Sequence, residues 1–597
     1  MENRNIRRKA VGSDFGFASR GSINRSGYGV SAPGSNAISR SGFLKTVGTG
    51  IAAAGFAAAG FGGTVSAQVP PGPTTVVGTG NWLVDVPAVQ AAVDLGGTVL
   101  LQGTFNFGYD RGGFLADEAY VFSAPDNTYH NPDAFKKGES TVYIKNDVTI
   151  TGETDSNGNL LTKIIGGCPA FWGGWDGNIT GIQNFEPAFN PSLLSTGAPQ
   201  QWDGVSVGLD FTPNVYGFRW CRAYPNVSAT ITNIHFDQPK YGAIIFGAGK
   251  NVTIEGNIVS NVSLALKDAW YLRGNFAPGL TADGPPQYRG LGVSVTAALA
   301  APFINLQKYI IASRTYPPGD PQIFYALLSA LSPTGNVTIS DNNIENIGYG
   351  EYNSSWWGET DGIVSLFTKA TSYTISGNTI TNVMPFESLG VLVSDNYGGL
   401  VTIENNVISE IGYYGIKDQA ILLPRSMNIL NNQISNCGSC LHTKVWISAI
   451  PFLYPGKHDL IQGNSCSGNA EHGILLMNAS NSQILGNNMG SLHASQAQVY
   501  LDDKSNNNYF GPDGNGIPNS LGNIVGQAQA GLKCEGSGNV FENDQWVVNY
   551  PSWESDKGLW WFTSSSQNNM VRNPYVQGGV KRDKQWKDEG VNNQLIL

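Results

Sequence analysis

The sequence predicts an all-β solenoid of stacked coils, because one short motif recurs at coil spacing and the segments that carry it have the chemistry of strands. The motif is Ile-x-x-Asn, usually with a further apolar residue five positions after the Ile. Successive Ile positions between residues 336 and 489 differ by 36, 28, 26, 32 and 23, about one solenoid coil. One earlier copy precedes this block, and the copies are Ile254/Asn257, Ile339/Asn342, Ile375/Asn378, Ile403/Asn406, Ile429/Asn432, Ile461/Asn464 and Ile484/Asn487.

Each copy of the motif has the pattern of two short strands joined by a tight corner. Segments 373–381 and 401–409 are rich in β-branched residues and alternate apolar with polar positions. Asn and Gly suit the corner because both tolerate a left-handed backbone. We expect the Asn side chains to hydrogen-bond along the stack, while the apolar faces of neighbouring coils form one core. A helical solenoid is not expected, because no coil contains a long segment of 3.6-residue periodicity.

A short helix is predicted before the first coil. Asp85 can cap it, Pro87 suits its first turn, and Gly96-Gly97 ends it before a strand. With the coils, this start resembles the right-handed parallel β-helix, or pectate-lyase-like, superfamily, in which such a helix plugs the open end of the core. The resemblance extends over about residues 80–545 and implies an all-β, right-handed parallel β-helix solenoid with a short N-terminal capping helix and two long loop insertions. It covers architecture alone, because neither the polygalacturonase-type set of motifs nor a pectate-lyase-type Arg-x-Pro-x-x-Arg run is present.

Composition agrees with turn-rich stacked strands, since only 13% of the 597 residues are charged and 75 are Gly. The charge is uneven. Residues 1–67 hold eight basic and two acidic residues, which gives a net charge of +6. Since the whole chain has a net charge of −10, residues 68–597 carry −16. An acidic body argues against a nucleic-acid partner, because phosphate binding needs basic patches.

The N-terminal region is predicted to be an export signal over residues 1–67. Basic residues come first, a long uncharged Ala/Gly-rich stretch follows, and Val65-Ser66-Ala67 resembles a small-residue cleavage site. Segment 39–45 resembles the twin-arginine motif, with Ser41 in place of the second Arg. We therefore expect a periplasmic, cell-surface or extracellular protein without a stable transmembrane segment after processing. A retained membrane anchor is the alternative.

The remaining chain divides into a linker, a solenoid and an end region. We assign residues 68–84 to the linker and 85–545 to the β-helix, with insertions at about 166–225 and 263–332. Insertions in solenoids emerge as loops on one side, often the binding face. The Trp-rich residues 546–597 are expected to cover the last coil.

Six Cys residues are present. Cys437, Cys440 and Cys466 fall in adjacent coils, so a Cys437–Cys440 or a Cys440–Cys466 disulfide is geometrically possible. Packing of these thiols in the core is an equal alternative.

Candidate site residues gather on the central coils. Lys417 and His442 occupy equivalent positions of successive coils, which predicts outward side chains at strand spacing, about 4.8 Å apart. Stacked polar groups on a long outer face are where the superfamily usually places its active site. A solvated face is the competing interpretation. Acids and a Trp pair lie on neighbouring coils, and the full candidate set is Glu359, Asp361, Asp395, Lys417, His442 and Lys444 for catalysis, with Trp356, Trp357, Glu351 and Asp418 for substrate binding.

Aromatic rings beside carboxylates suit a sugar-binding groove. Glu359 and Asp395 would act as acid and base in a hydrolase. In a lyase, Lys417 or Lys444 would remove the proton next to a uronate carboxylate held by Ca²⁺. The sequence thus predicts an exported protein that cleaves a polysaccharide by elimination or hydrolysis, with Ca²⁺ as a possible cofactor. The alternatives are a non-catalytic surface or adhesion β-helix that binds glycans or partners, and a carbohydrate epimerase.

Overall fold

The computed structural model forms two units, Met1–Ala67 and Gln68–Leu597. The predicted export signal is the first unit and lies outside the described residues. The structure describes residues 72–108, 141–167, 170–173, 227–239, 242–246, 249–262, 265–266, 288–295, 333–348, 358–366, 369–383, 388–394, 399–420, 426–445, 459–468, 471–490, 497–521, 530–548, 558–578 and 585–597.

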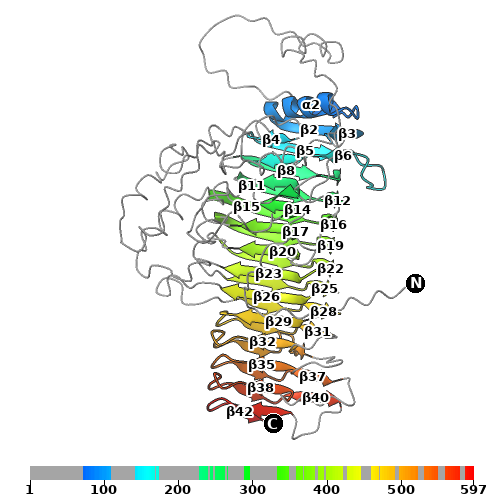
Figure 1. Cartoon of the computed structure of the whole chain (residues 1–597). Coiled ribbons are helices and arrows are strands. Elements are labelled where there is room, and N and C mark those ends of the chain that lie inside the picture. Colours follow the sequence, from blue (N-terminus) through cyan, green and yellow to red (C-terminus); the bar gives the residue numbers. More distant parts are fainter. Residues whose placement is uncertain are drawn as a thin grey trace, which may run out of the picture. The chain divides into compact units, whose positions relative to one another are not determined.

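Three long sheets of almost entirely parallel strands run side by side along the second unit, and each coil contributes one strand to each sheet (Figure 1). Sheet A has 15 described strands: β1 (Thr74–Val77), β2 (Gly97–Gln102), β5 (Val148–Gly152), β8 (Ser228–Thr232), β11 (Gly249–Glu255), β15 (Pro333–Ser340), β18 (Lys369–Ser376), β21 (Val401–Glu404), β24 (Met427–Leu430), β27 (Leu460–Gln462), β30 (Gln483–Leu485), β33 (Tyr509–Gly511), β36 (Val540–Glu542), β39 (Met570–Arg572) and β42 (Gln594–Ile596).

Sheet B follows sheet A in each coil and has 13 described strands: β3 (Thr104–Phe107), β6 (Lys163–Gly166), β9 (His235–Asp237), β12 (Ile258–Ser260), β16 (Asn343–Ile347), β19 (Thr379–Val383), β22 (Val407–Ile411), β25 (Gln433–Ser435), β28 (Ser465–Ser467), β31 (Asn488–Met489), β34 (Ser520–Leu521), β37 (Gln545–Val548) and β40 (Tyr575–Gly578).

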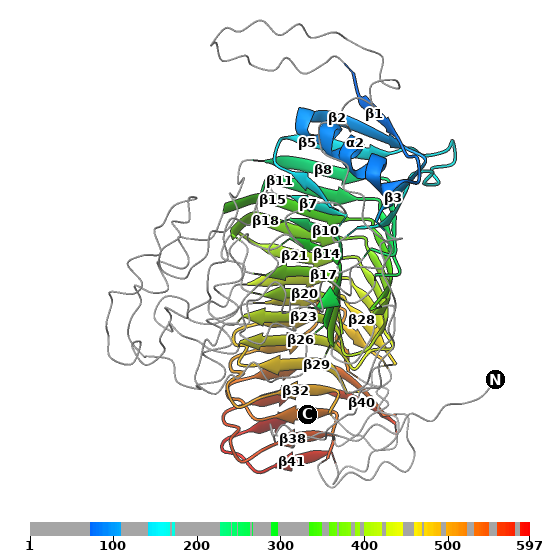
Figure 2. The same cartoon turned by 45° about the horizontal axis from the view of Figure 1, so that its top comes forward.

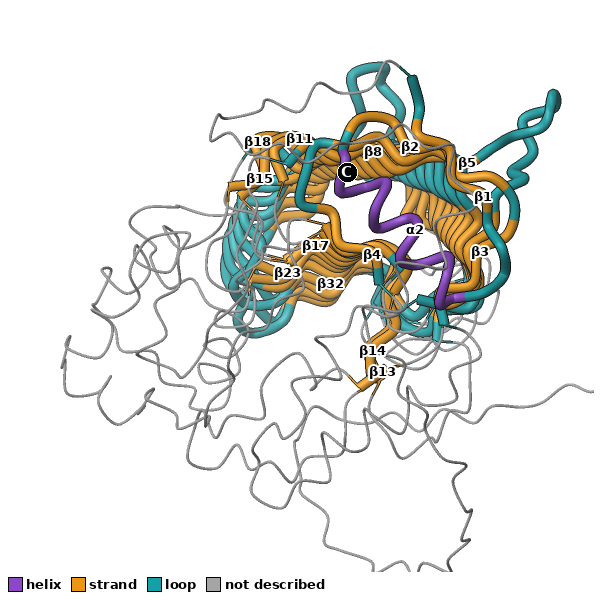
Figure 3. The backbone as a smooth tube through the Cα atoms, turned by 90° about the horizontal axis from the view of Figure 1, so that it is seen from above, coloured by secondary structure: helices purple, strands orange, loops and turns teal. Residues whose placement is uncertain are grey.

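Sheet C closes each coil and has 14 described strands, of which β13 pairs antiparallel with β14 at the side: β4 (Val142–Ile144), β7 (Phe171–Gly173), β10 (Gly242–Phe246), β13 (Ala265–Leu266), β14 (Tyr288–Val295), β17 (Gly358–Leu366), β20 (Leu389–Ser394), β23 (Tyr414–Ala420), β26 (Ser439–Val445), β29 (His472–Met477), β32 (Val499–Leu501), β35 (Leu532–Cys534), β38 (Trp560–Phe562) and β41 (Trp586–Asp588). Seen along the solenoid, the three sheets enclose one continuous interior (Figure 3).

The repeated Ile forms a single inward column of sheet A. Ile254 pairs in register with Ile339, and Ile339 with Ile375, and the same column continues through Ile403, Ile429, Ile461 and Ile484. These side chains are buried in one core cluster shared by all three sheets. The motif is therefore the sequence signature of the core, as predicted.

The motif Asn residues form the predicted ladder at the corner between sheets A and B. Each Asn Nδ2 donates to the Asn Oδ1 of the next coil over 2.9–3.1 Å, from Asn257 as far as Asn519. The same Nδ2 also donates to a main-chain carbonyl, as Asn406 does to Ile375 O. The left-handed residue is the one before the ladder Asn, for example Asn405 with φ 56° and Gly377 with φ 66°.

The helix α2 (Trp82–Leu95) covers the N-terminal end of the core (Figures 2 and 3). Val86, Val89 and Val93 join the core cluster. The predicted cap differs, because Asn81 accepts the hydrogen bond from Leu83 N over 3.1 Å. Asp85 is instead buried and accepts hydrogen bonds from Thr79 and from Asn106 N, which fasten the helix to the first coil. Within the described residues, no helix has the length and apolar character needed to cross a membrane.

The boundaries of the other predicted regions also differ. Residues 68–84 include β1, which pairs with β2. The range 263–332 includes β14, a full member of sheet C. The Trp-rich range 546–597 continues the coils through β42, and Trp546 and Trp560 fill the core at a ring separation of 6.0 Å.

The fold shows the state of two of the Cys residues in the predicted arrangements. Cys437 is a buried thiol, so a Cys437–Cys440 disulfide is wrong. Cys466 occupies the inward column of sheet B beneath Ile434 and is disulfide-bonded.

Candidate functional site

The long connections of the chain adjoin strands of sheet C in the sequence. The corner between sheets A and B is short in most coils, as where β21 ends at Glu404 and β22 begins at Val407. Both predicted insertions instead adjoin sheet C. The first, about 166–225, includes β7, and the second, about 263–332, includes β14, and both strands belong to sheet C. Because insertions in solenoids often mark the binding face, the outer face of sheet C is the candidate for ligand binding.

A kink at the start of the sheet C strands determines which side chains face outward. A Cβ at Gly362 would lie 2.6 Å from Cγ2 of the core residue Ile380, so Gly362 faces inward, as does Ile363. Asp361 therefore lies on the outer side. Its column in the sheet is Leu291, Asp361, Leu389, Tyr414, Ser439 and His472.

A second outer column runs beside the first. Lys417 and His442 are direct register partners on β23 and β26, which confirms the predicted equivalence of their backbone positions. The backbone register of this column continues in both directions through the positions of Tyr143, Trp172, Ile245, Ser294, Val364, Leu392, Lys417, His442, Leu475, Tyr500, Lys533, Trp561 and Lys587.

Asp361 and Lys417 are the predicted catalytic residues whose side chains the structure describes on this face. Asp361 is fully buried although it lies on the outer side of the sheet. The Lys417 ammonium group lies 5.3 Å from the centre of the Tyr414 ring, a cation–π distance. One strand, β20, lies between β17 and β23, and Lys417 is three residues beyond Tyr414, the register position of Asp361, so the two backbones stand roughly 14 Å apart.

The other predicted residues have different outcomes. The prediction of Asp418 as a substrate-binding residue is wrong. Asp418 is 4% exposed, and the strand register aligns it with the core residues Val393 and Leu476. Glu359, His442 and Lys444 are placed by their backbones on β17 and β26. Glu351, Trp356, Trp357 and Asp395 lie outside the described residues.

The lower coils carry a group of side chains that the sequence analysis did not select. The Lys533 ammonium group lies 4.6 Å from the Tyr500 ring and 5.2 Å from the Trp561 ring, and it forms a 2.7 Å ion pair with Glu535. His472 lies next to Tyr500, with ring centres 5.7 Å apart. We call His472, Tyr500, Lys533, Glu535 and Trp561 the lower cluster. The sequence could reveal this cluster only through an alignment of the coils after residue 490, because the Ile-x-x-Asn motif does not identify those coils.

Titratable groups of the lower cluster are shifted by burial. Burial lowers the pKa of His472 to about 4, and Lys533 acts in the same direction. Burial also raises the pKa of Tyr500, together with the charge of Glu535. Both side chains are therefore neutral at ordinary pH. Among the described residues, no three His, Cys, Asp or Glu side chains lie close enough together to hold a metal ion.

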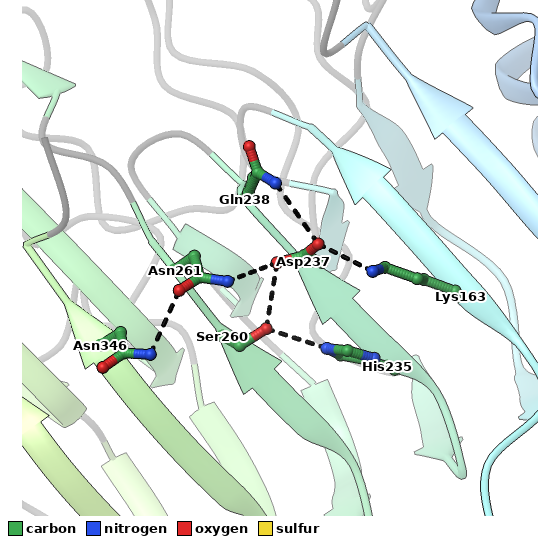
Figure 4. A network of polar contacts seen from close by, with 7 residues as sticks. All are labelled: Lys163, His235, Asp237, Gln238, Ser260, Asn261 and Asn346. Carbon is green, nitrogen blue, oxygen red and sulfur yellow. Dashed lines mark hydrogen bonds and ion pairs between the residues drawn. The ribbon is translucent and has the colours of Figure 1, made fainter.

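A separate polar network lies on the outer face of sheet B (Figure 4). Asp237 Oδ2 forms a 2.8 Å ion pair with Lys163, and Asp237 Oδ1 accepts hydrogen bonds from Ser260 and Asn261 over 3.1 and 2.7 Å. His235 Nε2 lies 2.8 Å from Ser260 Oγ. We call Lys163, His235, Asp237, Ser260 and Asn261 the sheet B clasp.

The sheet B clasp contains Ser, His and Asp but in an order that does not make a nucleophile. Because the Ser260 hydroxyl donates its hydrogen to Asp237, His235 Nε2 must donate to Ser260 rather than accept from it. In a catalytic triad His accepts the proton of Ser. Ser260 is also only 3% exposed. The clasp is therefore a structural contact between coils.

Comparison with known proteins gives the same fold. A family model for the right-handed β-helix region matches residues 361–574. Among solved structures, the Dettilon tailspike protein (gp208) is 12% identical with a TM-score of 0.36, covering 87% of this chain and 68% of that one. The tailspike gp61 of Pseudomonas phage phi297 is 11% identical with a TM-score of 0.32, covering 83% and 74%.

An enzyme module is also among these structures. The A-module of the mannuronan C-5 epimerase AlgE4 of Azotobacter vinelandii is 10% identical with a TM-score of 0.29, covering 87% of this chain and 96% of the module. No curated protein matches the chain. Identities and TM-scores this low carry no argument about activity, so the function is argued below from the site alone.

Proposed function

We propose that this chain, a right-handed parallel β-helix protein, is an exported carbohydrate-active protein that binds a polysaccharide on the outer face of sheet C and cleaves it. The observation that carries the proposal is the position of Asp361 and Lys417. An acid with no exposed surface and an ammonium group occupy two outer columns of sheet C, the sheet whose strands adjoin the long connections in sequence. Ionisable groups shielded from water are frequent at catalytic sites.

Two reactions suit this pair of groups. In a hydrolysis, Asp361 and a second carboxylate would serve as acid and base across the glycosidic bond, and Glu359 lies two residues away on the same strand β17. In an elimination, Lys417 would remove the proton next to a uronate carboxylate, and a bound Ca²⁺ would withdraw charge from that carboxylate. The first reaction needs no uronate, whereas the second cannot proceed without one.

The test is digestion of neutral and uronic polysaccharides by the wild-type protein and by Asp361→Asn and Lys417→Met. Each substrate is incubated with Ca²⁺ or with EDTA, and both new reducing ends and the ultraviolet absorbance of unsaturated uronates are recorded. Ends without absorbance, lost in Asp361→Asn, would establish hydrolysis. Ends with absorbance, lost in Lys417→Met, would establish elimination.

The matched control is Lys504→Met, because Lys504 lies on an exposed turn between sheets C and A. It should retain full activity, so a loss in Lys417→Met cannot reflect the removal of any one positive charge. Thermal melting of each variant separates loss of activity from loss of fold. Cleavage that survives both site variants would show that the reaction lies elsewhere on the chain.

A second candidate is a non-catalytic surface protein that binds glycans on the same face. The ion-paired state of Lys533 with Glu535 favours it, because charges already neutralised by each other suit binding better than proton transfer. It predicts retention on immobilised polysaccharide without new reducing ends on any substrate. That outcome would leave the binding face and remove the catalytic role of Asp361 and Lys417.

A further inference from the structure

We propose that the lower cluster is a binding subsite for a neutral glycan segment, held by ring contacts, by the Lys533–Glu535 pair and by His472 as a hydrogen-bond acceptor. The inference rests on the proposed function and names the ligand class and the residues for one part of the sheet C face.

The members of the lower cluster are contiguous along the face. Tyr500, Lys533 and Trp561 are successive register partners on β32, β35 and β38. Lys533 lies between the two rings, so the rings and the ammonium group hold one another in place. Rigid side chains lose little conformational freedom when a ligand binds, which favours a binding role.

The same arrangement is repeated below. Lys587 lies 5.9 Å from the Trp561 ring and forms a 2.8 Å ion pair with Glu589, and Glu589 also accepts a 3.1 Å hydrogen bond from Trp561 Nε1. Lys–Glu pairs thus recur two strands apart, at roughly 10 Å, on either side of one Trp. A repeat along the solenoid axis is suited to a ligand that is itself a repeating chain.

The charged groups of this subsite favour a neutral ligand over a charged one. Glu535 and Glu589 already compensate both ammonium groups, so a uronate would have to displace a carboxylate that is held in place. A hydroxyl group can instead donate to the carboxylate and accept from the ammonium group without breaking the pair. Residues 68–597 carry a net charge of −16, which further disfavours a polyanion.

His472 adds an acceptor with a fixed orientation. Its Nδ1 lies 2.6 Å from the carbonyl oxygen of Ala497, and a carbonyl can only accept, so Nδ1 carries the proton. In the neutral ring Nε2 is then an acceptor, and it has no hydrogen-bond partner in the described part of the chain. The side chain is 8% exposed, so a sugar hydroxyl could reach only one edge of it.

The experiment is isothermal titration calorimetry of the full-length protein with cellohexaose, mannohexaose and hexagalacturonate. We expect at least one neutral hexasaccharide to bind and hexagalacturonate to bind at least about tenfold more weakly. Lys533→Met, Trp561→Ala and His472→Phe should each weaken neutral binding about tenfold or more. The control Tyr575→Ala, an exposed ring on sheet B, should bind as the wild type does.

Further readouts separate the subsite from structural effects and from the proposed function. Affinity should be constant from pH 8 to 5.5 and fall near pH 4, because protonated His472 can no longer accept a hydrogen bond. The pH dependence should disappear in His472→Gln, because Gln keeps a donor for the Ala497 carbonyl and an acceptor for the ligand. Wild-type affinity in all three folded variants, preference for hexagalacturonate, or no neutral binding would overturn the subsite. Failure of this inference alone would leave cleavage by the Asp361 and Lys417 site intact, whereas failure of the proposed function would remove cleavage of every substrate, whether or not the lower cluster binds a glycan.

Discussion

A single residue, Asp544, limits the stability of the ladder at neutral pH. Asn519 Nδ2 donates to Asp544 Oδ1 over 2.9 Å, so Asp544 occupies the position that an Asn holds in the coils above. It is 1% exposed, and Oδ2 has no hydrogen-bond partner among the described residues. Burial raises the pKa of its carboxyl to about 8. A buried carboxyl that must take up a proton weakens the fold wherever the unfolded chain would be ionised.

We predict that Asp544→Asn stabilises the protein above pH 4. The pKa is raised in the folded state, so the stability that this group contributes is complete below its ordinary value of 3.8 and is lost as the pH rises towards 8. The Asn variant does not titrate, so its advantage should grow by up to about 1.4 kcal/mol per pH unit.

The measurement is the urea midpoint of both proteins at pH 4.5, 6 and 8. The exposed Asp503→Asn serves as the control and should show no pH-dependent gain. An equal midpoint difference at all three values would contradict the ionisation argument.

At the scale of the element, the ladder corner consists of two successive residues, and each has a separate role. Asn406 donates to Ile375 O and to Asn432 Oδ1, and its own Oδ1 accepts from Asn378. Asn405 supplies the left-handed backbone with φ 56°. Loss of the ladder side chain leaves several buried groups without partners, whereas Gly tolerates the left-handed position well.

We therefore predict that Asn406→Ala lowers the free energy of unfolding by roughly 2–4 kcal/mol, the range for several buried groups left unsatisfied. Asn405→Gly, one residue earlier, should change it by less than about 1 kcal/mol. Denaturant unfolding of the two variants beside the wild type gives both values. Similar losses in the two variants would mean that the ladder hydrogen bonds add little.

The same corner explains how much of the fold could be predicted. Ile and Asn recur because each has an obligatory position, one in the core column and one in the ladder, so sequence periodicity revealed both. The outer columns of sheet C have no such constraint. The kink at Gly362 and Ile363 places two successive residues inward, and simple alternation therefore does not reveal which neighbours face out. Asp418 follows Lys417 directly, so an outward Lys417 requires an inward Asp418, and its place among the acids of neighbouring coils does not reveal this.

At the scale of the whole solenoid, coils that are neighbours in space are separated in sequence by long connections. Sequence spacing identified the two insertions but not β14 within one of them, because β14 carries no ladder motif. The sheet B clasp joins coils on both sides of the first insertion, and Asn346 extends the contact across the second insertion. Lys163 precedes the first insertion and Asp237 follows it, while Asn346 Nδ2 donates to Asn261 Oδ1 over 3.2 Å across the second.

The clasp should make these upper coils sensitive to acid. Burial alone would raise the pKa of Asp237, but hydrogen bonds from Lys163 and Asn261 more than offset it and lower the pKa. Burial and Lys163 lower the pKa of His235. Both pKa values are depressed in the folded state, so stability is present above the ordinary values of 6.5 for His235 and 3.8 for Asp237 and is lost as the pH falls below each.

We predict that in the Asp544→Asn background, which removes the opposing titration of that carboxyl, the thermal midpoint falls as the pH drops below 6.5 and again below 3.8. Adding His235→Gln should reduce the first fall, and the remainder reports His472. Asp237→Asn should already be less stable at pH 7, by about 1–3 kcal/mol, because Lys163 and the donors around it lose a charged acceptor. Glu255→Gln, which changes an exposed acid at the end of β11, is the matched control.

Hydrogen exchange should localise the loss of stability in Asp237→Asn to β6, β9 and β12, because coils of a solenoid interact mainly with their neighbours. Protection that falls evenly along the chain, or an unchanged midpoint in Asp237→Asn, would show that the stacking of the coils and not the clasp holds this end of the solenoid together.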